Sequence, residues 1–164
     1  NSAKQHFLET TNPQNTQGSL PEAMVGADVF VGLSAPNVLT VDDLKAMNKD
    51  PIIFAMANPT PEIMPEIARE HVAVMGTGRS DYPNQINNLL AFPGILKGAL
   101  ACLATDINDE MKLAAAYAIA NMIDETVLTP DYVIPSVFNP DVVKAVSEAV
   151  IKAAQDSGVA RKTL

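Results

Sequence analysis

The stretch "PIIFAMANPTP", residues 51–61, decides the fold. Its first seven residues form a continuous apolar run that is too short for an ordinary helix and has the length of a strand. Such a run is typical of a strand that is buried on both faces, as in a parallel sheet covered by helices. The strand ends at Asn58, and Pro59 and Pro61 follow at once, so a stiff loop leaves its carboxyl end.

Two further runs have the same character. "ADVFVGL", residues 27–33, is rich in Val and Phe and suits a second strand buried on both faces. "HVAVMGTG", residues 71–78, predicts a third strand that ends near Gly76. Between the strands, Thr40 and Asp43 have the spacing of a capping box, and "PEIMPEIARE" (61–70) predicts a short helix. Strands that alternate with helices imply right-handed crossovers and a parallel sheet.

The remainder of the chain is predicted to be helical. A short helix is expected within residues 1–19, and another is capped by Ser19 and runs to Met24. Residues 84–104 are largely apolar at helical spacing, and Pro93-Gly94 interrupts them. Further helices are expected from Asn108 to about Asp124 and from Asn139 to about Gln155, with Gly158 ending the last one.

These elements predict the fold class. A helix and no strand precedes residue 27, and only three strands follow, which is few for a parallel sheet. The chain is therefore predicted to be α/β: the second half of a doubly wound parallel (Rossmann-like) sheet with additional C-terminal helices, and with its first βαβ unit missing. The edge of the 27–33 strand would then lack a partner, which favours association or poor solubility.

Composition limits the function classes. The chain has 164 residues, about one domain, with 48% apolar and 18% charged residues, which is typical of a globular protein. A net charge of −8 argues against binding to nucleic acid. No apolar run of membrane-spanning length and no secretory signal are visible, so we expect no membrane partner and a cytoplasmic location. The single cysteine, Cys102, excludes an internal disulfide and a zinc site built from cysteines.

Candidate ligand residues follow the strands, because open α/β sheets bind ligands outside the carboxyl ends of their strands. The segments there are "SAPN" (34–37), "NPTP" (58–61) and "GTGRSDYPNQINN" (76–88). The following proline holds Asn58 extended, which fixes its amide. Asn58 is either a ligand-facing residue or simply a turn-forming Asn-Pro.

The segment "NQINN", residues 84–88, has the same two interpretations. Asn84 is expected to cap a helix with Asn87 and Asn88 in its first turn, where free N–H groups favour a carboxylate. Amides donate and accept hydrogen bonds without titrating. Redundant capping of a solvated helix end is the alternative. The neighbouring Gly76 and Gly78 make only a fragment of a phosphate loop, which we reject as a pyrophosphate site.

Other polar residues are expected to be structural. His6 and His71 are isolated and have no second ligand at metal spacing. Cys102 lies in an apolar helix and is predicted to be an inert core thiol. Arg79 and Asp81 lie near the ends of the strands, and pairing with each other is favoured over contact with a ligand.

Taken together, these segments resemble the cofactor-binding domain of malic enzyme in its shorter bacterial form. The resemblance is carried by "GADVFVGLSAP" (26–36), "FAMANPTPEI" (54–63) and "GTGRSDYPNQINNLLAFPGILKGAL" (76–100). It extends over about residues 4–160 and corresponds to the carboxyl-terminal part of the enzyme. It implies oxidative decarboxylation of L-malate to pyruvate and carbon dioxide, with NAD or NADP as hydride acceptor and Mg²⁺ or Mn²⁺ required.

The resemblance also implies roles for individual residues. Asn58, the first residue of the Asn-Pro-Thr turn, is implied to contact the nicotinamide riboside and malate. Asn87 and Asn88 match an asparagine pair that binds malate, and Asn88 is the favoured member. Ser34 and Ala35 match a loop that lies along the dinucleotide.

The same resemblance implies which groups this chain lacks. The family's general-acid tyrosine, general-base lysine, carboxylate metal ligands and glycine-rich pyrophosphate loop belong to an upstream portion. Residues 1–164 are thus expected to be a partial NAD(P)-binding domain that holds no catalytic residue and no metal ligand. We expect the chain alone to be inactive and to bind dinucleotide weakly or not at all, and the full-length enzyme to be a homo-oligomer, a dimer.

Three alternatives stay open. A malolactic enzyme, which keeps NAD bound and converts malate to lactate, resembles the same family. A non-catalytic fragment could use its apolar surface for assembly with a partner. A Rossmann domain of another dehydrogenase is disfavoured by the two asparagine motifs. The choice between NAD and NADP is set by a residue after the second strand of such a fold, which lies upstream.

Overall fold

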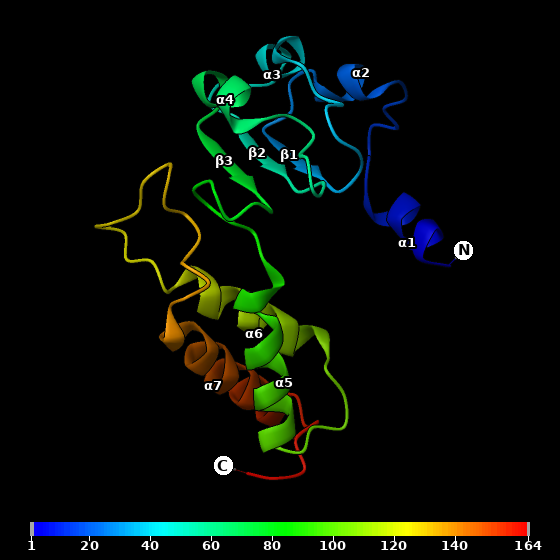
Figure 1. Ribbon diagram of the computed structural model, residues 1–164. Helices are drawn as coiled ribbons and strands as arrows, with labels where there is room; N and C mark the ends of the chain where they lie inside the picture. Colours follow the sequence, from blue (N-terminus) through cyan, green and yellow to red (C-terminus); the bar gives the residue numbers. More distant parts are fainter. Residues whose placement is uncertain (1, 164) are drawn as a thin grey trace.

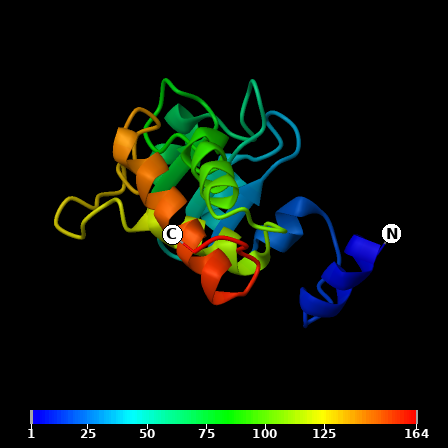
Figure 2. The same ribbon diagram turned by 90° about the horizontal axis from the view of Figure 1, so that it is seen from below.

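The chain forms a sheet half and a helical half, as a computed structural model that describes residues 2–163 shows (Figure 1). The sheet half comprises residues 20–77 and the helical half residues 88–163. Helix α1 (Ser2–Thr10) projects away from both halves in both views (Figures 1 and 2). None of the helices in residues 2–163 has the length and apolarity that a membrane span requires.

The sheet half is built around three parallel strands. They are β1 (Val29–Gly32), β2 (Ile52–Ala55) and β3 (Val74–Thr77), in the order β1-β2-β3. In the parallel register Val29 lies opposite Ile52, and Ile52 lies opposite Val74. All three strands fall within the apolar runs that predicted them, and the predicted parallel α/β sheet is confirmed.

Short helices precede and connect the strands, and two of them, α2 and α3, begin after the capping residues that predict them. They are α2 (Leu20–Met24), α3 (Val41–Ala46), α4 (Pro65–Ala68) and the 3₁₀ turn η1 (Arg69–His71). At the start of α3 the Thr40 N–H donates to Asp43 Oδ2 at 2.8 Å, and the Asp43 N–H donates back to Thr40 Oγ1 at 3.3 Å. This reciprocal pair is the predicted capping box.

The helices cover one face of the sheet. Ile53 and Ala55 of β2 and Phe30 of β1 pack with the apolar side chains of α2, α3 and α4. On the opposite face, the side chains of Val29 and Val31 remain 49% and 58% exposed. The prediction that the 27–33 strand is buried on both faces is therefore wrong for this chain, because all three helices pack on the same side of an edge strand.

The helical half has a hydrophobic core of its own. Its elements are the 3₁₀ turn η2 (Asn88–Leu90), α5 (Phe92–Ala101), α6 (Asp109–Ala120) and α7 (Pro140–Asp156). Asn108 and Asn139 cap α6 and α7 with their side chains, as predicted. Cys102 is fully buried in this core, as expected. The cluster shares no residue with the one beneath the sheet.

Helices α5 and α7 approach each other closely because α5 has glycines on the contact face. A Cβ at Gly94 would lie 2.6 Å from Val146 Cβ, and a Cβ at Gly98 would lie 2.7 Å from the Ser147 carbonyl oxygen. Real Cβ atoms essentially never approach so closely. Glycine costs helix propensity relative to alanine, so the close approach of the two backbones accounts for these residues.

We predict that Gly98→Ala destabilises the chain by about 1–3 kcal/mol, although alanine gains about 1 kcal/mol in helix propensity. The reason is that backbone, here the Ser147 carbonyl, cannot move aside as a flexible side chain can. Thermal or urea denaturation measures the change. Lys97→Ala, an exposed change one residue away on α5, is the matched control and should alter stability by less than about 0.5 kcal/mol. A Gly98→Ala variant as stable as the parent would contradict the tight α5–α7 contact.

Candidate functional site

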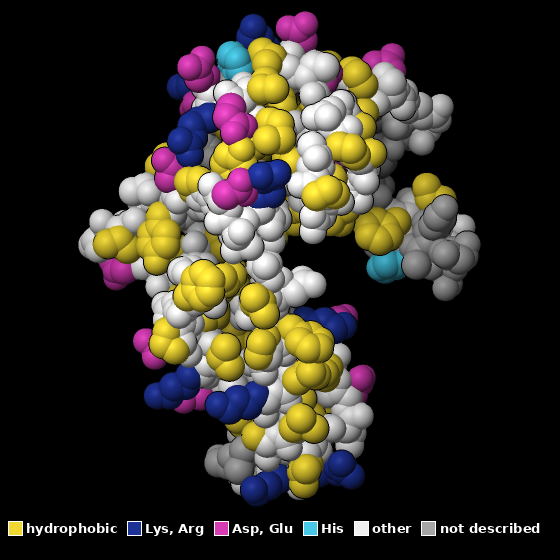
Figure 3. All heavy atoms as spheres, in the orientation of Figure 1, with side chains coloured by type: hydrophobic (Ala, Val, Ile, Leu, Met, Phe, Trp, Pro, Cys, Tyr) yellow, Lys and Arg dark blue, Asp and Glu magenta, His cyan; other side chains and the backbone are white. Residues whose placement is uncertain are grey.

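The carboxyl ends of the three strands face the helical half. The arrowheads of β1, β2 and β3 all point toward it, and three loops leave this edge of the sheet (Figure 1). The loops are residues 33–39, 56–63 and 78–91. The space-filling view is hollowed between the two halves on the side of β1 (Figure 3). This edge is where open parallel sheets bind their ligands.

The loops after β1 and β2 are joined along their length by backbone hydrogen bonds. The Met56 N–H donates to the Gly32 carbonyl at 3.0 Å, where the strands end. Further along, the Asn37 N–H donates to the Pro61 carbonyl at 3.1 Å, and the Leu39 N–H donates to the Glu62 carbonyl at 3.0 Å. The first two loops therefore form one continuous surface.

A buried carboxylate lies beneath that surface. The Glu62 side chain is 0% exposed. Its Oε1 accepts from the Ser34 N–H at 2.9 Å, and its Oε2 accepts from the Ala57 N–H at 3.0 Å. Sequence reasoning did not single out this residue. The available signal was the single charged side chain in the largely apolar "PTPEIMP" that follows a buried strand.

The predicted dinucleotide residues lie on the exposed side of the two joined loops. Ser34 and Ala35 follow β1, Asn58 follows β2, and all three are exposed. The Asn58–Pro59 peptide bond is cis. The parallel register, which places Gly32 opposite Ala55, brings these loops to neighbouring positions. The structure thus brings Ser34, Ala35 and Asn58 to the same edge of the sheet.

Asn84 does not cap a helix, contrary to the sequence prediction. It is 5% exposed, has a positive φ of 54°, and its amide is used in three hydrogen bonds. Its Nδ2 donates to the Met75 carbonyl at 3.0 Å and to the Pro130 carbonyl at 2.8 Å. Its Oδ1 accepts from the Val133 N–H at 2.8 Å. These partners draw the residue out of any helix and connect β3 to the 121–139 loop of the helical half.

Asn87 and Asn88 also lie outside the helix that was predicted for them. Asn87 caps the short 3₁₀ turn, where its Oδ1 accepts from the Leu89 N–H at 3.0 Å. Asn88 is exposed and forms no side-chain hydrogen bond with any residue in 2–163. Helix α5 begins only at Phe92, with Pro93 in its first turn rather than interrupting it. The helix-dipole argument for malate binding at 84–88 is therefore wrong.

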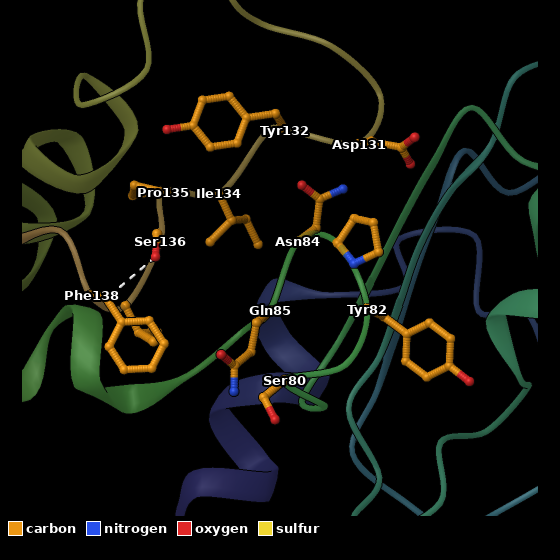
Figure 4. Close-up of a pocket in the computed structure, with 12 residues that line it drawn as sticks. Ser80, Tyr82, Asn84, Gln85, Asp131, Tyr132, Ile134, Pro135, Ser136 and Phe138 are labelled. Atoms are coloured by element: carbon orange, nitrogen blue, oxygen red, sulfur yellow. Dashed lines mark hydrogen bonds between the residues drawn. The ribbon is translucent and has the colours of Figure 1, made fainter.

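A separate cavity lies beside Asn84. It has a volume of about 230 Å³ and is enclosed by the 80–85 and 131–138 segments, including Tyr82, Gln85, Tyr132 and Phe138 (Figure 4). In this view the Asn84 amide lies between the two segments. The five residues implicated by the sequence do not line it, so this cavity is distinct from the edge of the sheet that carries Ser34 and Asn58.

Charged side chains of the third loop pair with one another. Arg79 Nε donates to Asp81 Oδ1 at 2.9 Å, and this pair holds the pKa of Asp81 below its ordinary value. The predicted pairing of Arg79 with Asp81 is confirmed. The Tyr82 hydroxyl donates to the Glu66 carboxylate, which lowers the pKa of Glu66 and raises the pKa of Tyr82. The contact between Tyr82 and Glu66 fixes the loop to α4.

The exposed groups at the sheet edge suit a dinucleotide better than a metal ion. Ser34 and Ala35 are small, so a nucleotide can approach the backbone closely, and Asn58 offers both a donor and an acceptor. Within residues 2–163 there is no group of three or more His, Cys, Asp or Glu that could hold a metal ion.

Comparison with known proteins identifies the family of the chain. The family model described as "Malic enzyme, NAD binding domain" matches residues 70–155, more than half of the chain. The chain belongs to the malic enzyme family. The predicted resemblance and the predicted Rossmann-like fold class are thereby confirmed. The dinucleotide, NAD or NADP, is the ligand class of the matched domain.

Curated relatives and solved structures of the family extend beyond this chain. It is 60% identical to an NAD-dependent malic enzyme of Geobacillus stearothermophilus, covering 96% of this chain and 33% of the relative. It is 56% identical to a bifunctional malic/malolactic enzyme of Bacillus subtilis (strain 168), covering 100% of this chain and 40% of the relative. The malic enzyme structure from Pyrococcus horikoshii Ot3 aligns with a TM-score of 0.90 at 44% identity, covering 94% of this chain and 36% of that one. The chain thus spans about a third of the length of these malic enzymes.

We predict that Asn84→Ala lowers the free energy of unfolding by about 2–4 kcal/mol. The change leaves the Met75 and Pro130 carbonyls and the Val133 N–H without their partner in a buried setting. Asn88→Ala, the same chemical change four residues away at an exposed position, should cost less than about 0.5 kcal/mol. Urea denaturation of both variants provides the measurement. Equal effects would show that the Asn84 amide does not join the two halves.

Proposed function

We propose that this chain supplies the nicotinamide and malate contacts of a longer malic enzyme, which converts L-malate to pyruvate and carbon dioxide with NAD or NADP as hydride acceptor. The observation that supports this most directly is the set of exposed amide and small side chains at the carboxyl edge of a parallel sheet, in a chain of this family. Residues 1–164 act as a partial NAD(P)-binding domain. The first βαβ unit and the substrate and metal domain belong to the rest of the enzyme.

The dinucleotide contacts are assigned to the joined loops after β1 and β2. Ser34 and Ala35 lie along the cofactor, and Asn58 contacts the nicotinamide riboside. The exposure of all three residues on one continuous loop surface supports this assignment. The dinucleotide supplies the hydride acceptor, and these residues orient it against malate.

The malate contacts are assigned to Asn58 and Asn88, with Asn87 beside them. Asn88 is the favoured residue for this role because its amide is exposed and makes no hydrogen bond with other side chains or backbone in residues 2–163. The Asn87 oxygen already caps the 3₁₀ turn, which leaves only its NH₂ group for a ligand. A neutral amide orients the hydroxyl or carboxylate of malate without a fixed charge that opposes hydride transfer.

The remaining groups of the reaction are assigned outside this chain. A general-acid tyrosine, a general-base lysine and the carboxylate ligands of Mg²⁺ or Mn²⁺ come from the rest of the enzyme, which is proposed to work as a homodimer. The open edge of β1 and the exposed Val29 and Val31 are the surface that the first βαβ unit covers.

A malolactic activity is the second candidate. It is favoured by the 56% identity to the Bacillus subtilis protein, whose name includes both malic and malolactic activities. Product analysis of the full-length protein distinguishes the two, since pyruvate with stoichiometric NAD(P)H indicates the malic reaction and lactate the malolactic one.

A purely structural role in assembly is the third candidate. Size-exclusion chromatography of the chain with and without the rest of the enzyme tests it.

We predict that the isolated chain forms no NADH or NADPH from malate and Mn²⁺, whereas the full-length protein does. The reason is that the described residues offer only neutral positioning groups and no cluster for the metal. Absorbance at the nicotinamide band measures both reactions. Turnover by the chain alone would overturn the proposed division of the site.

In the full-length enzyme we predict that Asn88→Ala lowers kcat/KM for malate by about 10- to 100-fold, the loss expected for a hydrogen bond to a charged substrate. Thermal stability should be unchanged because the side chain is exposed. Asn121→Ala, the same change at an exposed position after α6, is the control and should leave both quantities unchanged. An unaltered kcat/KM would remove Asn88 from the malate site.

A further inference from the structure

Glu62 lies directly under the surface to which the dinucleotide is assigned. Its carboxylate is fully buried, yet it has no cationic partner among the described residues. The side chain is held by the Ser34 and Ala57 N–H groups, with the Ser34 hydroxyl 3.5 Å from Oε1. A buried carboxylate is a costly way to fill a core position, and an apolar residue would fill the volume at lower cost.

The two oxygens of Glu62 bind two different loops. Oε1 accepts from the backbone at Ser34, one residue before Ala35, and Oε2 accepts from the backbone at Ala57, one residue before Asn58. The first hydrogen bond fixes the peptide between residues 33 and 34, next to Ser34 and Ala35, and the second fixes the peptide between residues 56 and 57, one residue before Asn58. One side chain thus joins the loop after β1 to the start of the loop after β2, in addition to the backbone hydrogen bonds between them.

The surrounding backbone is shaped to this carboxylate. A Cβ at Gly32 would lie 2.5 Å from both Cδ and Oε1 of Glu62, so a larger residue at the end of β1 would have to displace the carboxylate. The main chain of Glu62 is held in turn, since its carbonyl accepts from the Leu39 N–H at 3.0 Å. Glu62 is thus held by hydrogen bonds at both its carboxylate and its main chain.

We infer that Glu62 is a positioning residue of the dinucleotide crevice: its buried carboxylate holds the loops after β1 and β2 at the separation that the cofactor requires. The inference rests on the proposed dinucleotide function. Both oxygens must accept, because both facing groups are backbone N–H donors. Glutamine has the same shape but offers one acceptor and one donor, so it can hold only one of the two loops.

The test compares three variants of the full-length enzyme. Glu62→Gln removes one acceptor at nearly constant shape. Glu62→Asp keeps both acceptor oxygens but shortens the side chain by one methylene group. It is the variant to measure if Glu62→Gln does not fold. Val150→Ala is the control, because it removes buried apolar volume in the helical half and contacts neither loop.

Two readouts separate positioning from general stability. The first is hydrogen exchange of the 33–39 and 56–60 segments, which needs no ligand and should become about tenfold faster in Glu62→Gln but not in Val150→Ala. The second is the dissociation constant of NADH or NADPH, measured by fluorescence titration. It should rise about tenfold in Glu62→Gln, equivalent to about 1.4 kcal/mol, rise less in Glu62→Asp, and stay unchanged in Val150→Ala.

Each contrary result has a separate meaning. Unchanged exchange in both loops would overturn the inference whatever the enzyme binds. Faster exchange with an unchanged dissociation constant would overturn the role in cofactor binding, while malate turnover by the parent enzyme would leave the proposed function standing. A parent enzyme that neither binds the dinucleotide nor converts malate would overturn the proposed function itself, and this is visible before any variant is made.

Discussion

The buried amide of Asn84 is the interaction on which the arrangement of the chain depends. The sheet half and the helical half have separate hydrophobic clusters, so apolar packing within each does not define how the two meet. The Asn84 side chain defines it, by bonding to β3 through Met75 and to the 121–139 loop through Pro130 and Val133. The exposed ion pair of Arg69 and Asp131, 3.1 Å apart, spans the same junction but contributes little because water screens it.

Two buried polar residues, Glu62 and Asn84, support different parts of the candidate site. Glu62 holds the loops after β1 and β2 to each other, within the sheet half. Asn84 holds the sheet half to the segment that carries Asn87 and Asn88. In both cases a buried side chain supports a segment that carries exposed residues assigned to a ligand. Rigid support beneath flexible, exposed contact groups is a general requirement of binding sites.

Much of the sheet half could be predicted from the sequence, because short-range signals agree with the tertiary structure there. The apolar runs predict the strands, and the capping box of Thr40 and Asp43 predicts the start of α3. The predicted helix at 84–88 failed because local propensity could not reveal partners as distant as Pro130. The prediction that β1 is buried on both faces failed because the described residues cover only one of its faces. Glu62 was missed because its role depends on N–H groups that converge only when the strands are paired.

The glycines of α5 have a consequence for motion. At Gly94 and Gly98 α5 has no side chain of its own, so it lies directly against Val146 and the Ser147 carbonyl of α7 and has little room to slide along that helix. We expect α5 and α7 to move together as one rigid body. Any opening or closing around a ligand must then arise as rotation about residues 78–91, where the chain passes from the sheet half to the helical half, and about the contact of the 121–139 loop with Asn84. The displacement of the far end of α7 would measure the angle of that rotation.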